Sequence, residues 1–428
     1  MTHTPQHAAA LDATDPLARY RDKFYIPLVN NAECIYFTGN SLGLQPRSTQ
    51  DYVLNELEDW ANFGVEGHFH ARNPWLSYHE MFPSLLAPIV GALPEEIVVM
   101  NQLTVNLHLL LTTFYRPDAK RYKIICEAKA FPSDIYALES QIALHGYNVG
   151  DALIEVAPEE GQQVISTEAV LAAIEANKDS ACLIMLGGVN YYNGQVFDMA
   201  TITKAAHKAG IVAGFDLAHA AGNIELKLHD WEVDFACWCS YKYLNSGPGG
   251  VSGVYIHHKH ATNKSLPRLA GWWGHDKDSR FQMDREFIPI PTAEGWQLSN
   301  APVLSMAAHK ASLDIFAEAG MEALLRKSRE MNNLMITVIR EINETLGKPF
   351  INNITPDDAR GCQTSLLLDH HARDIFDALT GHGILADWRE PNVIRVAPVP
   401  LYNSFTDIHN FGQILLHLCN VVNEKQVV

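Results

Sequence analysis

The chain has 428 residues, of which 47% are hydrophobic and 19% are charged, and its formal net charge is −17 at pH 7. These values are typical of a folded globular protein with room for two domains, and they argue against an intrinsically disordered chain. The acidic balance disfavours binding to the phosphate backbone of nucleic acids.

Targeting and redox features indicate a soluble cytoplasmic protein. The first 23 residues contain no apolar central region, and no apolar run approaches the roughly 20 residues that a membrane helix needs. The seven cysteines include no C-x-x-C pair, which favours reduced thiols. Cys237 and Cys239 lie two residues apart in an apolar run, so we expect both in a buried core rather than in metal or redox chemistry.

Short β-rich runs alternate with amphipathic stretches from about residue 95 to residue 260. The expected strands are Ile97–Met100, Lys123–Glu127, Leu153–Val156, Ala181–Leu186, Ile211–Asp216, Phe235–Cys239 and Val251–His257. The expected helices between them are Val105–Tyr115, Ile135–His145, Glu168–Asn177 and Thr201–Ala209. This alternation predicts an α/β fold whose mostly parallel, seven-stranded sheet is covered by helices on both faces.

The pattern changes beyond Asn300. Two long helical patterns are followed by shorter expected elements: Leu304–Ala319, Met321–Leu346, Ser365–Leu368, Arg373–Thr380, Val393–Val396 and Ile408–Val422. We therefore predict a large domain over residues 46–309 and a smaller α+β domain formed by residues 1–45 and 310–428.

Two of the expected strands end in residues that suggest a cofactor. The run Ile211–Asp216 ends on an acid, and Lys242 follows the run Asp234–Cys239 beside a glycine-rich turn. A desolvated lysine at a strand end can act as a nucleophile. Pyridoxal phosphate needs this pair, because a lysine binds its aldehyde and an acid keeps its ring nitrogen protonated. Asp216 could also cap a helix over Leu217–Ala221, and the two roles are compatible.

Three further segments allow two interpretations each. The start of the helix at Leu103–Asn106 could cradle a phosphate, or Thr104 could serve as a simple cap. Phe131 could stack on a planar ring, although Phe131–Asp134 also resembles an ordinary helix start. Arg395, among apolar strand residues, could bind a substrate carboxylate or form a structural ion pair.

Two motifs suggest other chemistry. Gly39–Gly43 matches the G-x-S-x-G nucleophile elbow, but only the short run Ile35–Phe37 precedes it, so we expect a tight turn that lines a pocket. His257, His258 and His260 form a local cluster without a carboxylate or cysteine at ligand spacing. A solvated loop is therefore expected there rather than a metal site.

With these residues in view, the chain resembles the kynureninase family, a group of fold-type I pyridoxal-phosphate enzymes related to class V aminotransferases. The resemblance extends from about Tyr36 to Phe411. Its motifs are Tyr36–Pro46, Glu127–Asp134, Gly214–Asn223, Asp230–Asn245 and Ile394–Phe405.

The resemblance implies roles for individual residues. Lys242 would bind the cofactor covalently, Asp216 would pair with its ring nitrogen, and Tyr241 would supply the proton for the substrate's Cβ. The implied cofactor-binding residues are Leu103, Thr104, Phe131, Ser133, Asp134, Gly187, Asp216, His219, Tyr241, Lys242, Trp272 and Asn300. The implied substrate-binding residues are Ser41, His68, Asn300 and Arg395. The chain has Gly187 where the family has a serine, which leaves a side-chain phosphate contact there in question.

The implied reaction is hydrolysis of L-kynurenine or 3-hydroxy-L-kynurenine to L-alanine plus anthranilate or 3-hydroxyanthranilate, in tryptophan degradation or NAD biosynthesis. The alternative is another class V activity, either transamination or cysteine desulfuration. A desulfurase needs a reactive thiol, and Cys362, the one candidate, leads directly into an expected strand. A cofactor-binding protein without turnover would need neither Lys242 nor Arg395.

The family also implies a homodimer, in which Trp272 and Asn300 could act on their own subunit's site or reach the neighbouring one; the alternative is that Trp272 and Trp273 are only core aromatics. His68 and Asn300 resemble the pair found in animal-type kynureninases and could hydrogen-bond the phenolic hydroxyl of 3-hydroxykynurenine. The alternative is that Asn300 caps the following helix and His68 is solvated.

Overall fold

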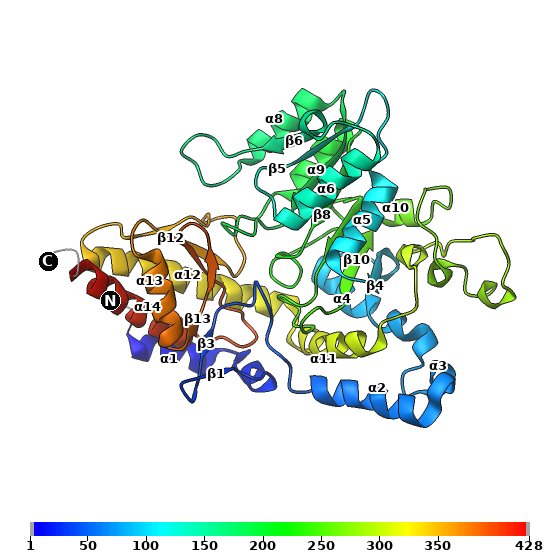
Figure 1. Cartoon of the computed structure of the whole chain (residues 1–428). Coiled ribbons are helices and arrows are strands. Elements are labelled where there is room, and N and C mark those ends of the chain that lie inside the picture. Colours follow the sequence, from blue (N-terminus) through cyan, green and yellow to red (C-terminus); the bar gives the residue numbers. More distant parts are fainter. Residues whose placement is uncertain (1–3, 425–428) are drawn as a thin grey trace. The chain divides into compact units, whose positions relative to one another are not determined.

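The computed structural model describes residues 4–424, and the chain divides into two compact units (Figure 1). The large unit comprises Thr49–Tyr191 and Phe197–Asp314. The small unit comprises Met1–Ser48, Tyr192–Val196 and Ile315–Val428. Within residues 4–424, no helix combines the length and the apolar character needed to cross a membrane.

A seven-stranded sheet forms the centre of the large unit. Its strands, in chain order, are β4 (Ile97–Met100), β5 (Lys123–Glu127), β6 (Leu153–Val156), β7 (Ala181–Gly187), β8 (Val212–Asp216), β9 (Phe235–Trp238) and β10 (Ser252–Ile256). The spatial order is β4-β10-β9-β8-β7-β5-β6. Strand β10 runs antiparallel to β4 and β9, whereas the pairs from β9 to β6 are parallel. The predicted mostly parallel sheet is confirmed.

Helices bury both faces of this sheet, as the apolar strand sequences require. The principal helices are α5 (Leu103–Phe114), α6 (Pro132–Leu144), α8 (Thr167–Asn177) and α9 (Met199–Lys208). On β7, Leu183 and Met185 pack into the core that includes residues of α5 and α6. The alternate residues Ile184 and Leu186 point to the other face and are equally buried.

The large unit contains further helices, some of which the sequence patterns did not predict. They are α2 (Thr49–Phe63), α3 (Gly67–His70), α4 (Pro83–Val90), α7 (Val149–Ala152), α10 (His258–Ala261) and α11 (Val303–Ala319). Helix α2 was missed because its inward positions include the buried acids Glu56 and Asp59, while several of its large apolar side chains face outward.

The small unit is an α+β structure, as predicted. Its main sheet is antiparallel in the order β11 (Ile351–Asn353), β12 (Thr364–Leu368), β15 (Val393–Val396) and β14 (Asp387–Arg389). A hairpin joins β1 (Leu28–Val29) to β2 (Ala32–Glu33), and β3 (Ile35–Tyr36) pairs in parallel with β13 (Ile384–Leu385). The helices are α1 (Pro5–Thr14), α12 (Met321–Leu346), α13 (Ala372–Gly381) and α14 (Phe405–Glu424). The predicted limits of the large domain, residues 46–309, remain a prediction.

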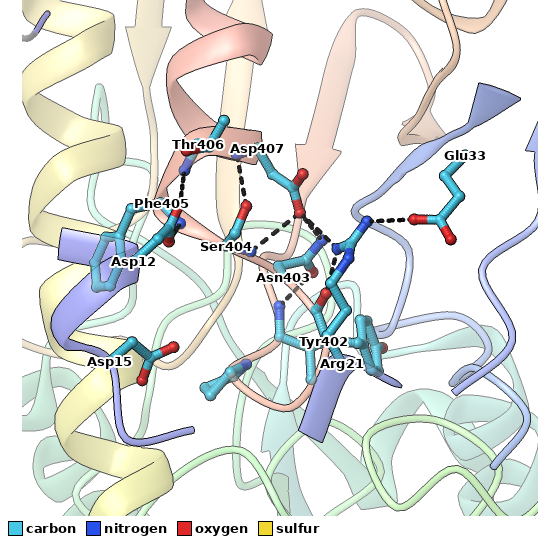
Figure 2. A network of polar contacts seen from close by, with 12 residues as sticks. Asp12, Asp15, Arg21, Glu33, Tyr402, Asn403, Ser404, Phe405, Thr406 and Asp407 are labelled. Carbon is cyan, nitrogen blue, oxygen red and sulfur yellow. Dashed lines mark hydrogen bonds and ion pairs between the residues drawn. The ribbon is translucent and has the colours of Figure 1, made fainter. Parts of the chain in front are cut away.

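Polar contacts join the N-terminal segment of the small unit to the start of α14 (Figure 2). The carboxylate of Asp12 accepts hydrogen bonds from the backbone N–H groups of Phe405 (2.7 Å) and Thr406 (3.0 Å), so it caps this helix. Arg21 pairs with Asp407 at 3.1 Å and with Glu33 at 3.2 Å. Asp12 and Arg21 thereby connect the N-terminal segment to the start of α14.

A buried ion pair lies beside this network. Asp15 contacts Lys327 at 2.7 Å, and both side chains are almost fully buried. Lys327 also donates to the backbone oxygens of Pro400 (2.7 Å) and Asn403 (2.9 Å). These contacts hold the segment that follows β15, the strand on which Arg395 lies.

Candidate active site

A cavity of about 260 Å³ lies at the carboxyl edge of the large unit's sheet. Its lining comes from the residues that end or follow five of the strands, because the carboxyl ends of parallel strands meet at one edge. The lining residues are Gln102, Leu103, Thr104, Val105, Glu127, Phe131, Ser133, Asp134, Gly187, Val189, Tyr191, Asp216, Ala218, His219, Tyr241 and Lys242.

Lys242 is a buried amine on the wall of this cavity, 9% exposed. It follows the buried strand β9, as the sequence suggested. Its Nζ lies 3.0 Å from Nε2 of His219 and 5.8 Å from the centroid of the Phe131 ring. The amine therefore has a hydrogen-bond partner and an aromatic neighbour, and it faces the same space as Asp216.

Asp216 ends β8 with its carboxylate buried. Its Oδ1 accepts a hydrogen bond of 2.7 Å from the N–H of Ala218, but the residues that follow form turns, so the expected helix over Leu217–Ala221 is wrong. Burial raises the pKa of Asp216. Burial and the nearby Asp216 carboxylate raise the pKa of Asp134 well above its usual range. A cationic N–H placed here would relieve this repulsion, as the ring nitrogen of pyridoxal phosphate requires.

The start of α5 forms another wall of the cavity. Leu103, Thr104 and Val105 occupy the first turn of this helix, and no side chain caps it at Gln102. The hydroxyls of Thr104 and Ser133 lie 2.8 Å apart. Uncapped N–H groups at a helix start, together with two hydroxyls, fit a phosphate group. The residues present therefore fit pyridoxal phosphate at both its ring nitrogen and its phosphate.

Glu127 also lines the cavity, although no local sequence pattern marks it as a site residue. Its carboxylate accepts hydrogen bonds from the N–H of Gly187 at 3.0 and 3.3 Å. Burial raises the pKa of Glu127 to about 7. A Cβ at position 187 would lie 3.0 Å from Oε1 of Glu127. A serine side chain at this position would therefore press against the carboxylate and require it to shift by a few tenths of an ångström.

Three aromatic residues, Phe131, Tyr191 and Tyr241, also line the cavity. Burial raises the pKa of the Tyr241 phenol, so it keeps its proton at neutral pH. Phe131 packs edge-on against Tyr191, with 5.2 Å between the ring centroids. Tyr191, like Glu127, was not singled out from the sequence, because nothing in its local pattern marks it.

Three predicted site residues of the large unit do not line this cavity. Trp272 is 47% exposed and donates from Nε1 to the backbone oxygen of Arg280 at 3.2 Å. Asn300 is exposed. His68 lies 3.0 Å from the backbone oxygen of Val65 through Nδ1, and its ring packs edge-on against Trp75.

Arg395 and Ser41 lie together in the small unit. Arg395 is fully buried, with Nη2 at 2.8 Å from Oδ2 of Asp387 and 3.3 Å from the Ser41 hydroxyl. The Ser41 hydroxyl donates to Asp387. The turn Gly39–Gly43 follows β3, which has two residues and a single partner strand, so it lacks the inner strand that a nucleophile elbow requires.

Cys362 does not have the properties of a desulfurase nucleophile. It is buried in the small unit, and its Sγ lies 3.4 Å from the Ser328 hydroxyl. Burial raises the pKa of this thiol to about 12, which suppresses the reactive thiolate.

Solved structures with the same arrangement of elements define the class of protein. One is a C-DES mutant with glycine covalently linked to its PLP cofactor, at a TM-score of 0.74 and 16% identity, covering 90% of this chain and 97% of that one. Another is the cysteine desulfurase of Thermococcus onnurineus, at a TM-score of 0.74 and 18% identity, covering 94% and 97%. At such identities the likeness shows the fold alone. The fold is that of the fold-type I pyridoxal-phosphate enzymes, as predicted.

Relatives in sequence narrow the class to one family. The kynureninase C-terminal domain model matches residues 324–415. The kynureninase of Flavobacterium psychrophilum is 54% identical over 414 residues, covering 96% of this chain and 97% of that protein. Those of Myxococcus xanthus (51%, covering 95% and 96%) and Nematostella vectensis (45%, covering 96% and 93%) are similar over comparable lengths. The chain belongs to the kynureninase family.

Proposed function

We propose that the chain is a pyridoxal-phosphate-dependent hydrolase of L-kynurenine, 3-hydroxy-L-kynurenine or both. It releases L-alanine together with anthranilate or 3-hydroxyanthranilate by cleaving the Cβ–Cγ bond. Membership of the kynureninase family carries this proposal. The cavity supports it, because Lys242 and Asp216 face one space beside an uncapped helix start.

Three side chains and one helix start of the large unit would hold the cofactor. Lys242 would bind its aldehyde, Asp216 its ring nitrogen, Phe131 the face of its ring, and the first turn of α5 its phosphate. When bound, pyridoxal phosphate supplies an electron-withdrawing ring that stabilises negative charge developing on the substrate's carbon atoms.

The side chains of the chain would then move protons at defined atoms. Ionised Asp216 would hold a proton on the ring nitrogen. The Lys242 amine, once released, would take the proton from the substrate's Cα, and His219, 3.0 Å away, would orient that amine. Tyr241 would donate its proton to Cβ, and its raised pKa keeps the phenol in the proton-bearing form. Water would add to the γ-carbonyl before the aryl acid leaves.

Arg395 would bind the substrate's α-carboxylate. Its guanidinium can form two parallel hydrogen bonds to a carboxylate, and Asp387 and Ser41 hold it in place through Nη2. We expect Arg395→Lys to raise the KM for kynurenine. A lysine keeps the positive charge but cannot form the two parallel hydrogen bonds to the carboxylate.

Product analysis tests the reaction assignment. The purified enzyme, incubated with kynurenine and with 3-hydroxykynurenine, should release alanine and the corresponding aryl acid. Borohydride reduction followed by peptide mapping should place the cofactor on Lys242. A label on Lys204, or products of transamination instead of alanine, would contradict the assignment.

We also infer a preference for the 3-hydroxylated substrate, through hydrogen bonds from His68 and Asn300 to its phenolic hydroxyl. A hydroxyl bound by these two side chains makes hydrogen bonds that kynurenine cannot make, which lowers kcat/KM for kynurenine relative to the 3-hydroxylated substrate. The difference between the two substrates should shrink in Asn300→Thr and His68→Trp. An equal or reversed preference in the unmodified enzyme would contradict this inference. It would not affect the assignment of the reaction.

A homodimer is the assembly we propose. Helix α2 exposes a stripe of large apolar side chains three residues apart, at Leu54, Leu57, Trp60 and Phe63, the tryptophan being 62% exposed. Such a stripe supports contact with another protein surface, and a second copy of the chain would cover it. Sedimentation should show a dimer that Trp60→Glu dissociates, whereas an active monomer at assay concentration would exclude it. We place the enzyme in the cytoplasm, in tryptophan degradation or NAD biosynthesis.

A further inference from the structure

A cluster of three imidazoles and one carboxylate lies at the amino edge of the large unit's sheet, opposite the cavity. Glu96 directly precedes β4, His229 lies in the turns between β8 and β9, and His257 and His258 follow β10. The expected solvated loop is wrong for His257, which is 5% exposed. The carboxylate that the local sequence lacks comes from Glu96, 162 residues before His258.

The imidazoles converge on one oxygen through the same ring atom. Oε1 of Glu96 lies 3.0 Å from Nδ1 of His229, 3.3 Å from Nδ1 of His258 and 3.8 Å from Nδ1 of His257. It also accepts a hydrogen bond of 2.9 Å from the backbone N–H of His258. The other carboxylate oxygen is fixed by the N–H of Leu93 at 3.0 Å.

Hydrogen bonds alone would crowd this oxygen. A carboxylate oxygen accepts about two hydrogen bonds, and the backbone N–H of His258 and the imidazole of His229 already supply two. The Nδ1 of His258, 3.3 Å from the same oxygen, would be a third partner. An arrangement of one anionic oxygen and neighbouring imidazole nitrogens is suited to a bound cation.

His257 supports the other two rings instead of offering a ligand. Its Nδ1 accepts a hydrogen bond of 3.2 Å from the N–H of Lys259. Its ring stacks on His229 (centroids 5.2 Å apart, 13° between planes) and on His258 (4.6 Å, 30°). It therefore sets the orientation of both rings, as the second layer around a metal site usually does.

The spacing matches a tetrahedral zinc site. Bonds of about 2.0–2.1 Å to nitrogen and oxygen place tetrahedral ligands roughly 3.3–3.5 Å apart. The distances from Oε1 to the two Nδ1 atoms are 3.0 and 3.3 Å, and the ligand atoms of the whole cluster lie within 4.8 Å of one another. The side chains of His258 and His229 are 49% and 30% exposed, so an ion and its water can enter from solvent.

Neighbouring charges distinguish this cluster from a second group of histidine and acid side chains in the large unit, His79, Glu80 and Glu294. There, Lys277 lies 2.8 Å from both glutamates and already supplies a cation. The lysines next to the histidines of the Glu96 cluster pair with other acids: Lys259 with Asp234 at 2.9 Å and Lys227 with Glu225 at 3.2 Å.

We propose that Glu96 Oε1, His229 Nδ1 and His258 Nδ1 bind one zinc ion, with water as the fourth ligand. The ion would join three segments that are far apart in the sequence: the start of β4, the turns after β8 and the start of α10. Its role is structural, because it lies at the opposite edge of the sheet from Lys242.

Zinc titration of the cofactor-loaded, chelator-treated enzyme by calorimetry tests the proposal. The unmodified enzyme should bind one equivalent, and its melting temperature should rise with zinc concentration. Glu96→Gln and His258→Ala should each weaken binding at least tenfold. His258 is half-exposed, so its variant keeps the fold even if the Glu96 variant does not. His207→Gln is the matched control, since His207 lies at the same edge but contacts Asp234 at 2.8 Å.

Cobalt(II) provides a second measurement, because its visible absorption reports the coordination number. A four-coordinate spectrum in the unmodified enzyme that is absent in His258→Ala supports the site. The proposal is overturned if the unmodified enzyme binds no stoichiometric zinc, if His258→Ala binds it equally well, or if His207→Gln weakens binding as much as His258→Ala.

Discussion

Replacing Glu127 by glutamine should change how the stability of the cofactor-free protein depends on pH. Burial raises the pKa of Glu127 from 4.5 to about 7. Between these two values the folded state holds a proton that the unfolded state has lost, so the free energy of unfolding falls as pH rises. The glutamine keeps an oxygen for the N–H of Gly187 but does not titrate in this range.

The raised pKa of Glu127 sets the size of this stability difference. A difference of 2.5 pKa units corresponds to about 3 kcal/mol at 1.36 kcal/mol per unit, an order-of-magnitude figure. The unfolding free energy of Glu127→Gln minus that of the unmodified protein should therefore grow by about 3 kcal/mol between pH 4.5 and pH 8, most of it above pH 5.

Urea unfolding of both cofactor-free proteins at pH 5, 6, 7 and 8 measures this difference. Glu155→Gln is the control, because Glu155 is an exposed carboxylate on the adjacent strand β6. Its difference from the unmodified protein should stay nearly constant over the same range. A Glu127→Gln difference that is equally flat would refute the reasoning, since it would mean that the carboxylate stays ionised in the cavity.

Three further outcomes follow from the described contacts. Lys242→Ala should bind pyridoxal phosphate without a borohydride-reducible link, and a retained link would assign attachment to another lysine. Asp216→Ala should still bind the cofactor but lose several kcal/mol of transition-state stabilisation, seen as a fall in kcat of roughly 100-fold or more; near-normal turnover would mean that another acid serves the ring nitrogen. Asp15→Ala leaves the buried Lys327 without its carboxylate partner and should lower the unfolding free energy by about 3–5 kcal/mol, whereas a urea midpoint near that of the unmodified protein would contradict this account.

Most strands of the large unit could be predicted because they are buried on both faces and therefore have an almost continuous apolar sequence; the edge strand β6, with its exposed Glu155, is the exception. The same logic failed for α2, whose buried positions include Glu56 and Asp59. Hydrogen bonds from other segments allow this burial. For Glu56, the donors are Tyr78 and Trp75. No periodicity of α2 itself could reveal those partners.

The site residues also differ in whether the local sequence could reveal them. Lys242 and Asp216 could be found because Asp216 ends a predicted strand and Lys242 closely follows another, and chain direction fixes the edge of the sheet at which both lie. Glu127 also ends a strand, but its role depends on the approach of Gly187 from β7, a contact across 60 residues. Glu96 and His258 meet across 162 residues. Tertiary proximity of this kind leaves no mark on the local sequence.

The contacts that tie both ends of the chain into the small unit have a consequence for biosynthesis. Arg21 and Asp407 are 386 residues apart, so at a synthesis rate of roughly 5–20 residues per second the arginine waits on the order of 20–80 seconds for its partner. During that time the first 48 residues lack most of the core of the small unit, because residues 315–428 are made last. Nearly the whole of the large unit is synthesised in the same interval. The nascent N-terminal segment therefore stays without its C-terminal partners until translation is almost complete.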